Sequence, residues 1–196
     1  MKDLILQTGS PVLRAVAAPV PKKDFGSAQL TTLIKKMKTA LKKEEFGVAL
    51  AAPQVGASLR IFIVSEKVFE EKPKDTSQRS SGLLARRQTS SRQGEARPFV
   101  QHLLATHPLV FVNPEITRLS RTKREMSEGC LSVRGVYGSV LRHERASIKA
   151  HDEHGKAFVH HASGLLAHIF QHECDHLEGV LYTDVAEKLV QEKTDA

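Results

Sequence analysis

The sequence contains few cysteines and no long apolar run, and both absences narrow the class of protein. Its two cysteines, Cys130 and Cys174, are too few for a disulfide-stabilised scaffold. In a chain with ten histidines they favour a reducing compartment and a thiolate metal ligand over a disulfide. No apolar stretch approaches the ~20 residues that a membrane-spanning helix requires. The start, MKDLILQTGSPVL, lacks the pattern of a secretory signal or a transit peptide. We therefore expect a globular protein with no membrane association.

Length and composition are those of one globular domain. The 196 residues are 40% hydrophobic and 26% charged. A chain of this size buries roughly two-thirds to three-quarters of its unfolded surface. We predict a single domain over residues 1–196.

The positive charge is concentrated in one segment, Lys72–Arg97. The chain has a formal charge of +7, and this segment holds seven Lys or Arg residues against Asp75 and Glu95. The segment is rich in Ser, Arg and Gln and has no hydrophobic periodicity, so we interpret residues 72–97 as a flexible basic insertion. It is either a docking arm for RNA or the ribosome, or a tolerated surface insertion.

Hydrophobic patterns predict an α+β fold. The stretch SAQLTTLIKKMKTALKK (27–43) has apolar residues at helical spacing, with Ser27 as N-cap. A second helix is predicted between Ser163 and Gly179. Strand patterns include LRIFIVSE (59–66) and LVFVNPEI (109–116), the latter ending at Asn113-Pro114. The segment RASIKAHDEHGKAFVHH (145–161) predicts a hairpin. The N-terminal stretch (4–21) mixes strand-like and turn residues, and its prolines exclude a long helix. We expect mostly antiparallel strands around the late helix.

The late helix carries the sequence QHECDH, from Gln171 to His176. Residues i and i+4 lie on one helix face, so His172 and His176 can direct two ring nitrogens at one metal ion. Glu173 lies about 100° around the helix from His172, which suits a general base beside the ligands. The alternative is an exposed polar helix face. The apolar residues of the same helix favour the metal site, because a buried His-Glu-His cluster needs partners.

A catalytic site of this kind needs a third protein ligand. Cys130 in EGCLSV is the candidate, because thiolates bind late first-row ions strongly. Its alternative role is that of a small buried hydrophobic residue. Cys174 lies on roughly the opposite helix face from His172, and we interpret it as core packing. We interpret six other histidines as surface or hairpin polar residues: His143, His151, His154, His160, His161 and His168.

Three segments, in order, resemble the signature motifs of the peptide deformylase family: GVALAAPQVG, EGCLSV and QHECDHLEGVLYTD. The start, ILQTGSPVLR, also resembles the beginning of that family. The resemblance covers nearly the whole chain except the insertion and the last few residues. It implies an α+β fold with antiparallel sheets around a central metal-binding helix. It also implies a metal-dependent hydrolase that removes the N-formyl group from N-formylmethionyl nascent polypeptides and releases formate.

The resemblance implies roles for the residues of the motifs. Cys130, His172 and His176 would hold one divalent ion, Fe²⁺ in the native enzyme, with Zn²⁺, Ni²⁺ or Co²⁺ as replacements. Glu173 would be the general base that later protonates the departing amine.

The resemblance also implies two donors to the formyl oxygen, the side chain of Gln54 and the backbone N–H of Leu131. Loss of one such donor typically costs ~3–4 kcal/mol. The substrate peptide would bind as an added strand through the backbone of four residues: Gly47, Val48, Ala49 and Gly129.

The sequence departs from the family pattern in the expected substrate groove. Ala49 stands where the family usually has a second glycine, and its Cβ narrows the space for the substrate backbone. Arg134 replaces a usual proline, and Tyr137 stands where many members have a substrate-binding arginine. These departures affect substrate affinity and selectivity rather than the chemistry.

Two alternatives to an active deformylase stay open. One is a catalytically weak or specialised relative that binds nascent chains or ribosomes through the basic insertion. The other is an HExxH metallopeptidase with Glu178 or Glu187 as third ligand. We expect an N-formylmethionyl peptide as substrate, transient ribosome contact, and a monomer, with a dimer as the alternative. The long insertion favours the mitochondrion over a plastid or the bacterial cytoplasm.

Overall fold

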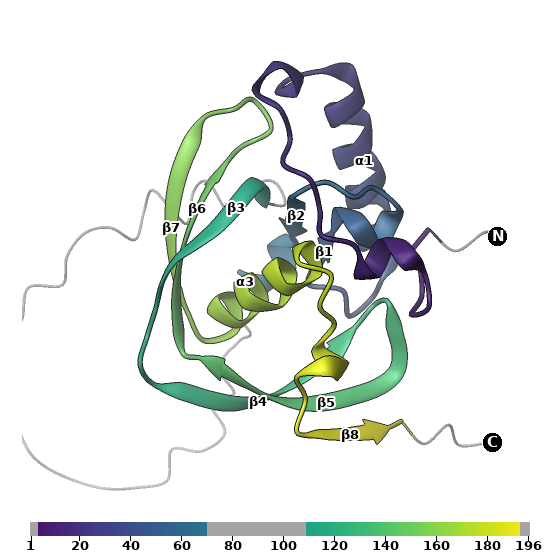
Figure 1. Ribbon diagram of the computed structural model, residues 1–196, viewed down its shortest axis with the longest axis vertical. Coiled ribbons are helices and arrows are strands. Elements are labelled where there is room, and N and C mark those ends of the chain that lie inside the picture. The colour runs from purple at the N-terminus through teal and green to yellow at the C-terminus, as the bar shows by residue number, and fades with distance from the viewer. Residues whose placement is uncertain (1–3, 70–108, 193–196) are drawn as a thin grey trace, which may run out of the picture.

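A computed structural model describes residues 4–69 and 109–192 of the chain. Within these residues the strands form two antiparallel sheets, and a central helix, α3, lies among them (Figure 1). The predicted α+β fold is therefore confirmed. The predicted insertion at residues 72–97 lies outside the described residues.

The larger sheet has the strand order β1-β2-β3-β6-β7, and every neighbouring pair is antiparallel. Its strands are β1 (Ala49–Ala51), β2 (Ile61–Val64), β3 (Leu109–Leu119), β6 (Arg145–His151) and β7 (Ala157–Ser163). The smaller sheet has the order β4-β5-β8, with β4 (Lys123–Cys130), β5 (Val133–His143) and β8 (Lys188–Gln191). The predicted hairpin is confirmed, because β6 pairs with β7 throughout.

The two predicted helices are present. Helix α1 (Ala28–Lys43) begins after Ser27, whose Oγ accepts a hydrogen bond from the backbone N–H of Leu30 at 3.2 Å. Helix α3 (Gly164–Leu177) follows Ser163, which makes no side-chain cap. It ends before Gly179, whose φ of 74° lies in the left-handed region. No helix of residues 4–69 and 109–192 has the length and apolar character needed to span a bilayer.

Aromatic side chains fix α3 against the larger sheet. Phe62 of β2 and Phe111 of β3 stack with ring centroids 4.5 Å apart. Phe170 of α3 meets Phe111 edge to face at 5.1 Å. All three side chains are fully buried. This packing holds α3 in place, and α3 carries the QHECDH sequence.

Strand β3 is longer than predicted. It continues past Asn113-Pro114 to Leu119. The pairing with β6 is irregular between Val112 and Glu115. Such a bulge accommodates a proline without a ladder hydrogen bond. Asn113 adopts a φ of 51°, and its side-chain amide bonds both backbone groups of Val20. Asparagine tolerates this conformation, so the strand resumes after it.

The strand-like character predicted near the N-terminus is largely absent. Short 3-10 helices occupy Pro11–Arg14 and Lys22–Asp24 instead. One isolated bridge, between Ala18 and Leu59, pairs this stretch with the remaining described chain. The prolines that exclude a long helix also remove the backbone donors that a strand would need.

Candidate metal centre and substrate cavity

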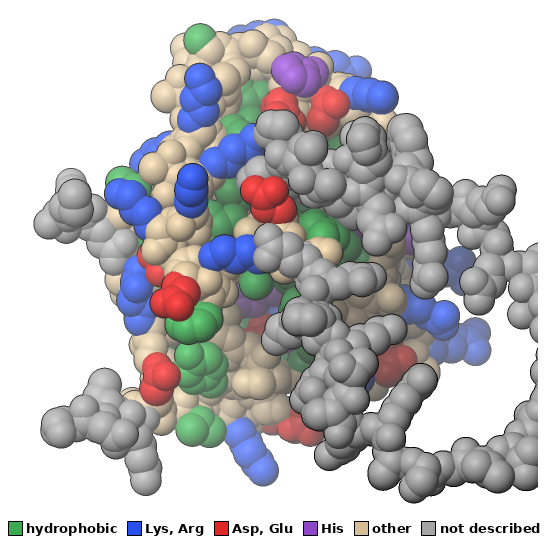
Figure 2. Space-filling model, turned by 180° about the vertical axis from the view of Figure 1, so that it is seen from behind, with side chains coloured by type: hydrophobic (Ala, Val, Ile, Leu, Met, Phe, Trp, Pro, Cys, Tyr) green, Lys and Arg blue, Asp and Glu red, His purple; other side chains and the backbone are tan. Residues whose placement is uncertain are grey.

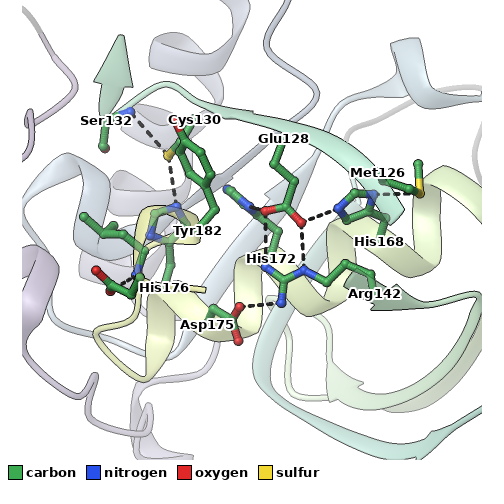
Figure 3. A network of polar contacts seen from close by, with 12 residues as sticks. Met126, Glu128, Cys130, Ser132, Arg142, His168, His172, Asp175, His176 and Tyr182 are labelled. Atoms are coloured by element: carbon green, nitrogen blue, oxygen red, sulfur yellow. Dashed lines mark hydrogen bonds and ion pairs between the residues drawn. The ribbon is translucent and has the colours of Figure 1, made fainter. Parts of the chain in front are cut away.

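Three candidate ligands converge from one strand and one helix. His172 and His176 lie one turn apart on α3, and Cys130 is the last residue of β4. Their donor atoms all lie within 4.8 Å of one another. The Cys130 Sγ is 3.2 Å from Nε2 of His176 (Figure 3). The structure thus brings together the three residues that the sequence pointed to.

This donor set fits a late first-row divalent ion. Metal–ligand bonds are about 2.0 Å long to nitrogen and about 2.3 Å long to sulfur. Donor atoms that share one ion therefore lie close together, as the donor atoms of these three residues do. One sulfur and two imidazole nitrogens are the ligand types that iron, cobalt, nickel and zinc accept. The buried Nδ1 of His176 has no hydrogen-bond partner among the described residues, so its ring is not committed to a competing contact through that atom.

Glu128 orients one of these ligands. Its carboxylate is buried on β4 and accepts a hydrogen bond from His172 Nδ1 at 2.8 Å. Although burial opposes the charge, hydrogen bonds from His168, His172 and Arg142 hold the pKa of Glu128 well below its usual range. An ionised carboxylate only accepts, so Nδ1 of His172 keeps its proton when the ring binds a metal, and Nε2 is the nitrogen that is then free of a proton. That is the tautomer a metal ligand needs.

Arg142 balances the buried charge of Glu128. Its Nε and Nη2 donate to the two carboxylate oxygens of Glu128 at 2.7 and 3.2 Å. Its Nη1 donates to Asp175 Oδ2 at 2.6 Å. A planar guanidinium can make all these contacts at once. Arg142 therefore ties β5 to both β4 and α3 behind the candidate ligands.

Glu173 is placed for proton transfer. Its side chain is 3% exposed, and Oε2 has no hydrogen-bond partner among the described residues. Burial raises the pKa of Glu173 to about 7, although the charge of His172 opposes this. A carboxyl group with such a pKa can both accept and release a proton near neutral pH.

Gln54 lies next to Cys130. Its Oε1 accepts from the backbone N–H of Ala51 at 2.8 Å, which fixes the orientation of the amide. Its Nε2 donates to Ser132 Oγ at 3.1 Å and faces Cys130 Sγ at 3.5 Å. The donor end of the amide therefore points toward the candidate metal centre.

A cavity of about 610 Å³ opens onto the centre. It contains Gln54, Cys130, His172 and Glu173 in its lining. The remaining predicted site residues also line it: Gly47, Val48, Ala49, Gly129 and Leu131. The structure therefore brings every predicted residue except the innermost ligand, His176, to the surface of one cavity.

The departures from the family pattern lie at the same cavity. Arg134 Nη2 donates to Glu44 Oε1 at 2.9 Å, and both residues line the cavity. The ring of Tyr137 covers Gly129 so closely that an added Cβ would lie 3.0 Å from Tyr137 Cε1. A side chain at position 129 would therefore require the Tyr137 ring to shift.

One histidine was predicted wrongly. His168 is not a surface or hairpin residue, because it is 5% exposed and hydrogen-bonds Glu128 through Nε2. Its neighbours in α3 are apolar, and its partner, Glu128, lies on a strand that is distant in the sequence. The local sequence therefore did not indicate this contact. By contrast, Cys174 packs against the core cluster as predicted, and burial raises its pKa to about 12.

Sequence reasoning also missed the residues behind the ligands, Glu128 and Arg142. One signal was available for Glu128, because it precedes Cys130 by two residues in a strand and such residues share a face. Arg142 carried no comparable signal. Glu178, the alternative third ligand, pairs instead with Arg60 at 2.6 Å. Its side chain is 51% exposed.

The chain is similar to known proteins over most of its length. The sequence model described as polypeptide deformylase matches residues 2–192. A peptide deformylase of Treponema pallidum is 34% identical over 176 residues, which cover 90% of this chain and 83% of that protein. A chloroplastic/mitochondrial peptide deformylase 1A of Arabidopsis thaliana is 35% identical over 182 residues, or 92% of this chain. The chain spans only 60% of that plant relative's length.

Solved structures share the fold. A peptide deformylase of Acinetobacter baumannii with Met-Ala-Ser bound superposes with a TM-score of 0.68 and 29% identity. The match covers 92% of this chain and 96% of that one. With motifs, site geometry and nearly the full sequence in agreement, the chain belongs to the polypeptide deformylase family.

Proposed function

We propose that this protein removes the N-formyl group from N-formylmethionyl peptides by metal-dependent hydrolysis. The observation that carries the proposal is the group of Cys130, His172 and His176 donors within 4.8 Å, beside the buried carboxyl group of Glu173. The family is metal-dependent, and this donor set is complete here. Fe²⁺ is the proposed native ion, and Zn²⁺, Ni²⁺ and Co²⁺ suit the same ligands.

Glu173 moves the proton in the proposed reaction. Cys130, His172 and His176 would hold an ion that would supply Lewis acidity to the reaction. Glu173 accepts a proton as water attacks the formyl carbon. It then donates that proton to the amine nitrogen as the C–N bond breaks, so the products are formate and a free amino terminus. Its pKa of about 7 suits both transfers.

Gln54 and Leu131 stabilise the oxygen of the formyl group as it gains charge. Gln54 Nε2 is already aimed toward Cys130, and its amide is fixed by Ala51. A donor fixed before the reaction needs no reorganisation during it. The backbone N–H of Leu131 would supply the second donor from the residue after Cys130.

The cavity is suited to an extended peptide. Gly47, Val48 and Ala49 line it beside β1, which is an edge strand of the larger sheet. Gly129 lines it from β4, an edge strand of the smaller sheet. We propose that a substrate strand adds between them. The related A. baumannii protein binds Met-Ala-Ser, a peptide that begins with methionine.

Partners and location are inferred from the insertion and the relatives. Figure 2 shows Lys and Arg side chains dispersed among acidic ones over the described part of one face. Most of the excess positive charge lies instead in residues 72–97, so we assign transient ribosome contact to that segment. We propose one domain over residues 1–196, a monomer, and an organellar location, with the mitochondrion favoured. The Arabidopsis relative is described as chloroplastic/mitochondrial.

Formate release tests the function directly. The protein is loaded with Fe²⁺ or Co²⁺ under anaerobic conditions and mixed with formyl-Met-Ala. We expect metal-dependent release of formate, and none from acetyl-Met-Ala. Fully metallated protein that releases no formate would contradict the proposal. Cleavage of unformylated peptides would identify a metallopeptidase instead.

A further inference from the structure

Alternate residues of β4 face successive turns of α3 (Figure 3). Residues 126, 128 and 130 of the strand contact residues 168, 172 and 176 of the helix. The contacts join Met126 Sδ to His168 Nδ1 at 3.0 Å, Glu128 Oε2 to His172 Nδ1 at 2.8 Å, and Cys130 Sγ to His176 Nε2 at 3.2 Å. We call these three contacts the strand–helix ladder.

The ladder depends on two repeats of similar length. Two residues of a strand advance about 6.6 Å, and four residues of a helix advance about 6 Å. Side chains on one strand face can therefore meet one helix face several times in succession. The second and third rungs contain the candidate metal ligands. The first rung, formed by Met126 and His168, contains none.

The carboxylate of Glu128 contacts the histidines of both the first and the second rung. Glu128 Oε1 receives Nε2 of His168 and Nε of Arg142, and Oε2 receives Nδ1 of His172 and Nη2 of Arg142. A carboxylate has about four lone-pair sites, so these four donors saturate it. Glu128 is thus held from both sides. His168 fixes the oxygen opposite the one that orients His172.

The contact with Glu128 accounts for a polar side chain at position 168. Its neighbours in α3, Ala167 and Ile169, are buried and apolar. An imidazole at such a position costs free energy unless its nitrogens are bonded. Nε2 is bonded to the buried Glu128 carboxylate, and Nδ1 lies 3.0 Å from the Met126 sulfur. His168 also lines the cavity, next to the candidate centre.

We propose that His168 is a positioning residue for the metal centre. It acts through Glu128, and it sets the orientation in which His172 presents Nε2. The proposal rests on the proposed metal-binding function. Outer partners of metal ligands typically contribute about 10–100-fold to metal affinity. Because His168 acts one contact further away, the lower end of that range applies.

The test measures Co²⁺ affinity and the visible spectrum of the Co²⁺ protein, which reports ligand geometry. His168→Leu removes the N–H donor and introduces an apolar side chain of moderate size. His168→Gln replaces the ring N–H by an amide N–H that can donate to Glu128. Met126→Leu removes only the thioether, and His161→Leu repeats the change of residue type at an exposed position of β7.

We expect His168→Leu to weaken Co²⁺ binding about 10-fold and to alter the spectrum. His168→Gln should restore most of both, and the two control variants should stay within about twofold of the wild-type protein. A merely structural role would lower the unfolding temperature and leave the affinity and spectrum of the folded protein unchanged. Wild-type affinity and spectrum in His168→Leu would overturn the inference alone. A wild-type protein that binds no Co²⁺ would overturn the proposed function, and the inference with it.

Discussion

The sulfur of Cys130 lies 3.2 Å from Nε2 of His176, although 46 positions separate the two residues in the sequence. This contact places a strand residue and a helix residue at one candidate centre. We expect Cys130→Ala to lose most of its bound metal and its deformylase activity, because two imidazoles alone bind weakly. Metal analysis after gel filtration measures the loss.

Cys174→Ala is the matched control for this prediction. Cys174 packs in the core, away from the donor group. It should keep its metal and activity, at a small cost in stability. Loss of metal from Cys174→Ala with retention by Cys130→Ala would reverse the assignment.

Glu173→Gln removes the base and keeps the shape of the side chain. Its activity should fall by about 10²- to 10⁴-fold, the usual contribution of a positioned acid or base. Metal content should remain near one ion per chain, since Glu173 is not one of the three donors. Formate assays and metal analysis on one sample separate the two effects.

Glu178→Gln controls for the loss of a glutamate near the same helix. Glu178 pairs with Arg60 at the surface. This variant should keep full activity and metal. An inactive Glu178→Gln that had also lost its metal would favour the metallopeptidase alternative.

Gln54→Glu tests the oxyanion donor. The new side chain can still accept from Ala51, but it no longer donates from the position of Nε2. We expect kcat/KM to fall by about 10²- to 10³-fold. The same change at exposed Gln29 should have no effect on the formate assay. Unchanged kinetics in Gln54→Glu would remove Gln54 from the mechanism.

Arg142→Leu leaves the buried carboxylate of Glu128 without its guanidinium partner. Removal of one member of a buried ion pair typically costs about 3–5 kcal/mol. We expect a loss of that size in the free energy of unfolding in urea. Arg14→Leu breaks the exposed pair with Asp184 and should cost less than about 1 kcal/mol. Equal losses in the two variants would contradict the special role of Arg142.

Gly179→Ala should destabilise the fold at the end of α3. An added Cβ would lie 2.5 Å from the backbone oxygen of Arg14, and φ is 74°. Gly26 has a similar φ of 71° but nothing within 4 Å of its added Cβ. Gly26→Ala therefore reports the backbone strain alone, about 1–2 kcal/mol. Gly179→Ala should lose clearly more in urea unfolding, and equal losses would show that the clash relaxes.

Local sequence patterns predicted both helices and one hairpin. Helix α1, helix α3 and the β6–β7 hairpin follow from apolar spacing within each segment, and Ser27 caps α1 as predicted. Strand β3 was cut short at Asn113, because the support for its bulge comes from Val20, far away in the sequence. A local pattern contains no information about such a partner.

Only part of the candidate site could be predicted from the sequence. Cys130, His172 and His176 belong to short motifs whose residue types indicate metal binding, and the structure brings them together. Arg142 and His168 belong to no motif. Their roles depend on the register of β4 and β5 against α3, which the sequence alone does not reveal.

The strand–helix ladder has a consequence for length changes in the two motifs. One residue inserted between Glu128 and Cys130 would turn the cysteine to the other face of β4. One residue inserted between His172 and His176 would rotate the second histidine by about 100°. We therefore expect homologous chains to keep both spacings free of insertions and deletions.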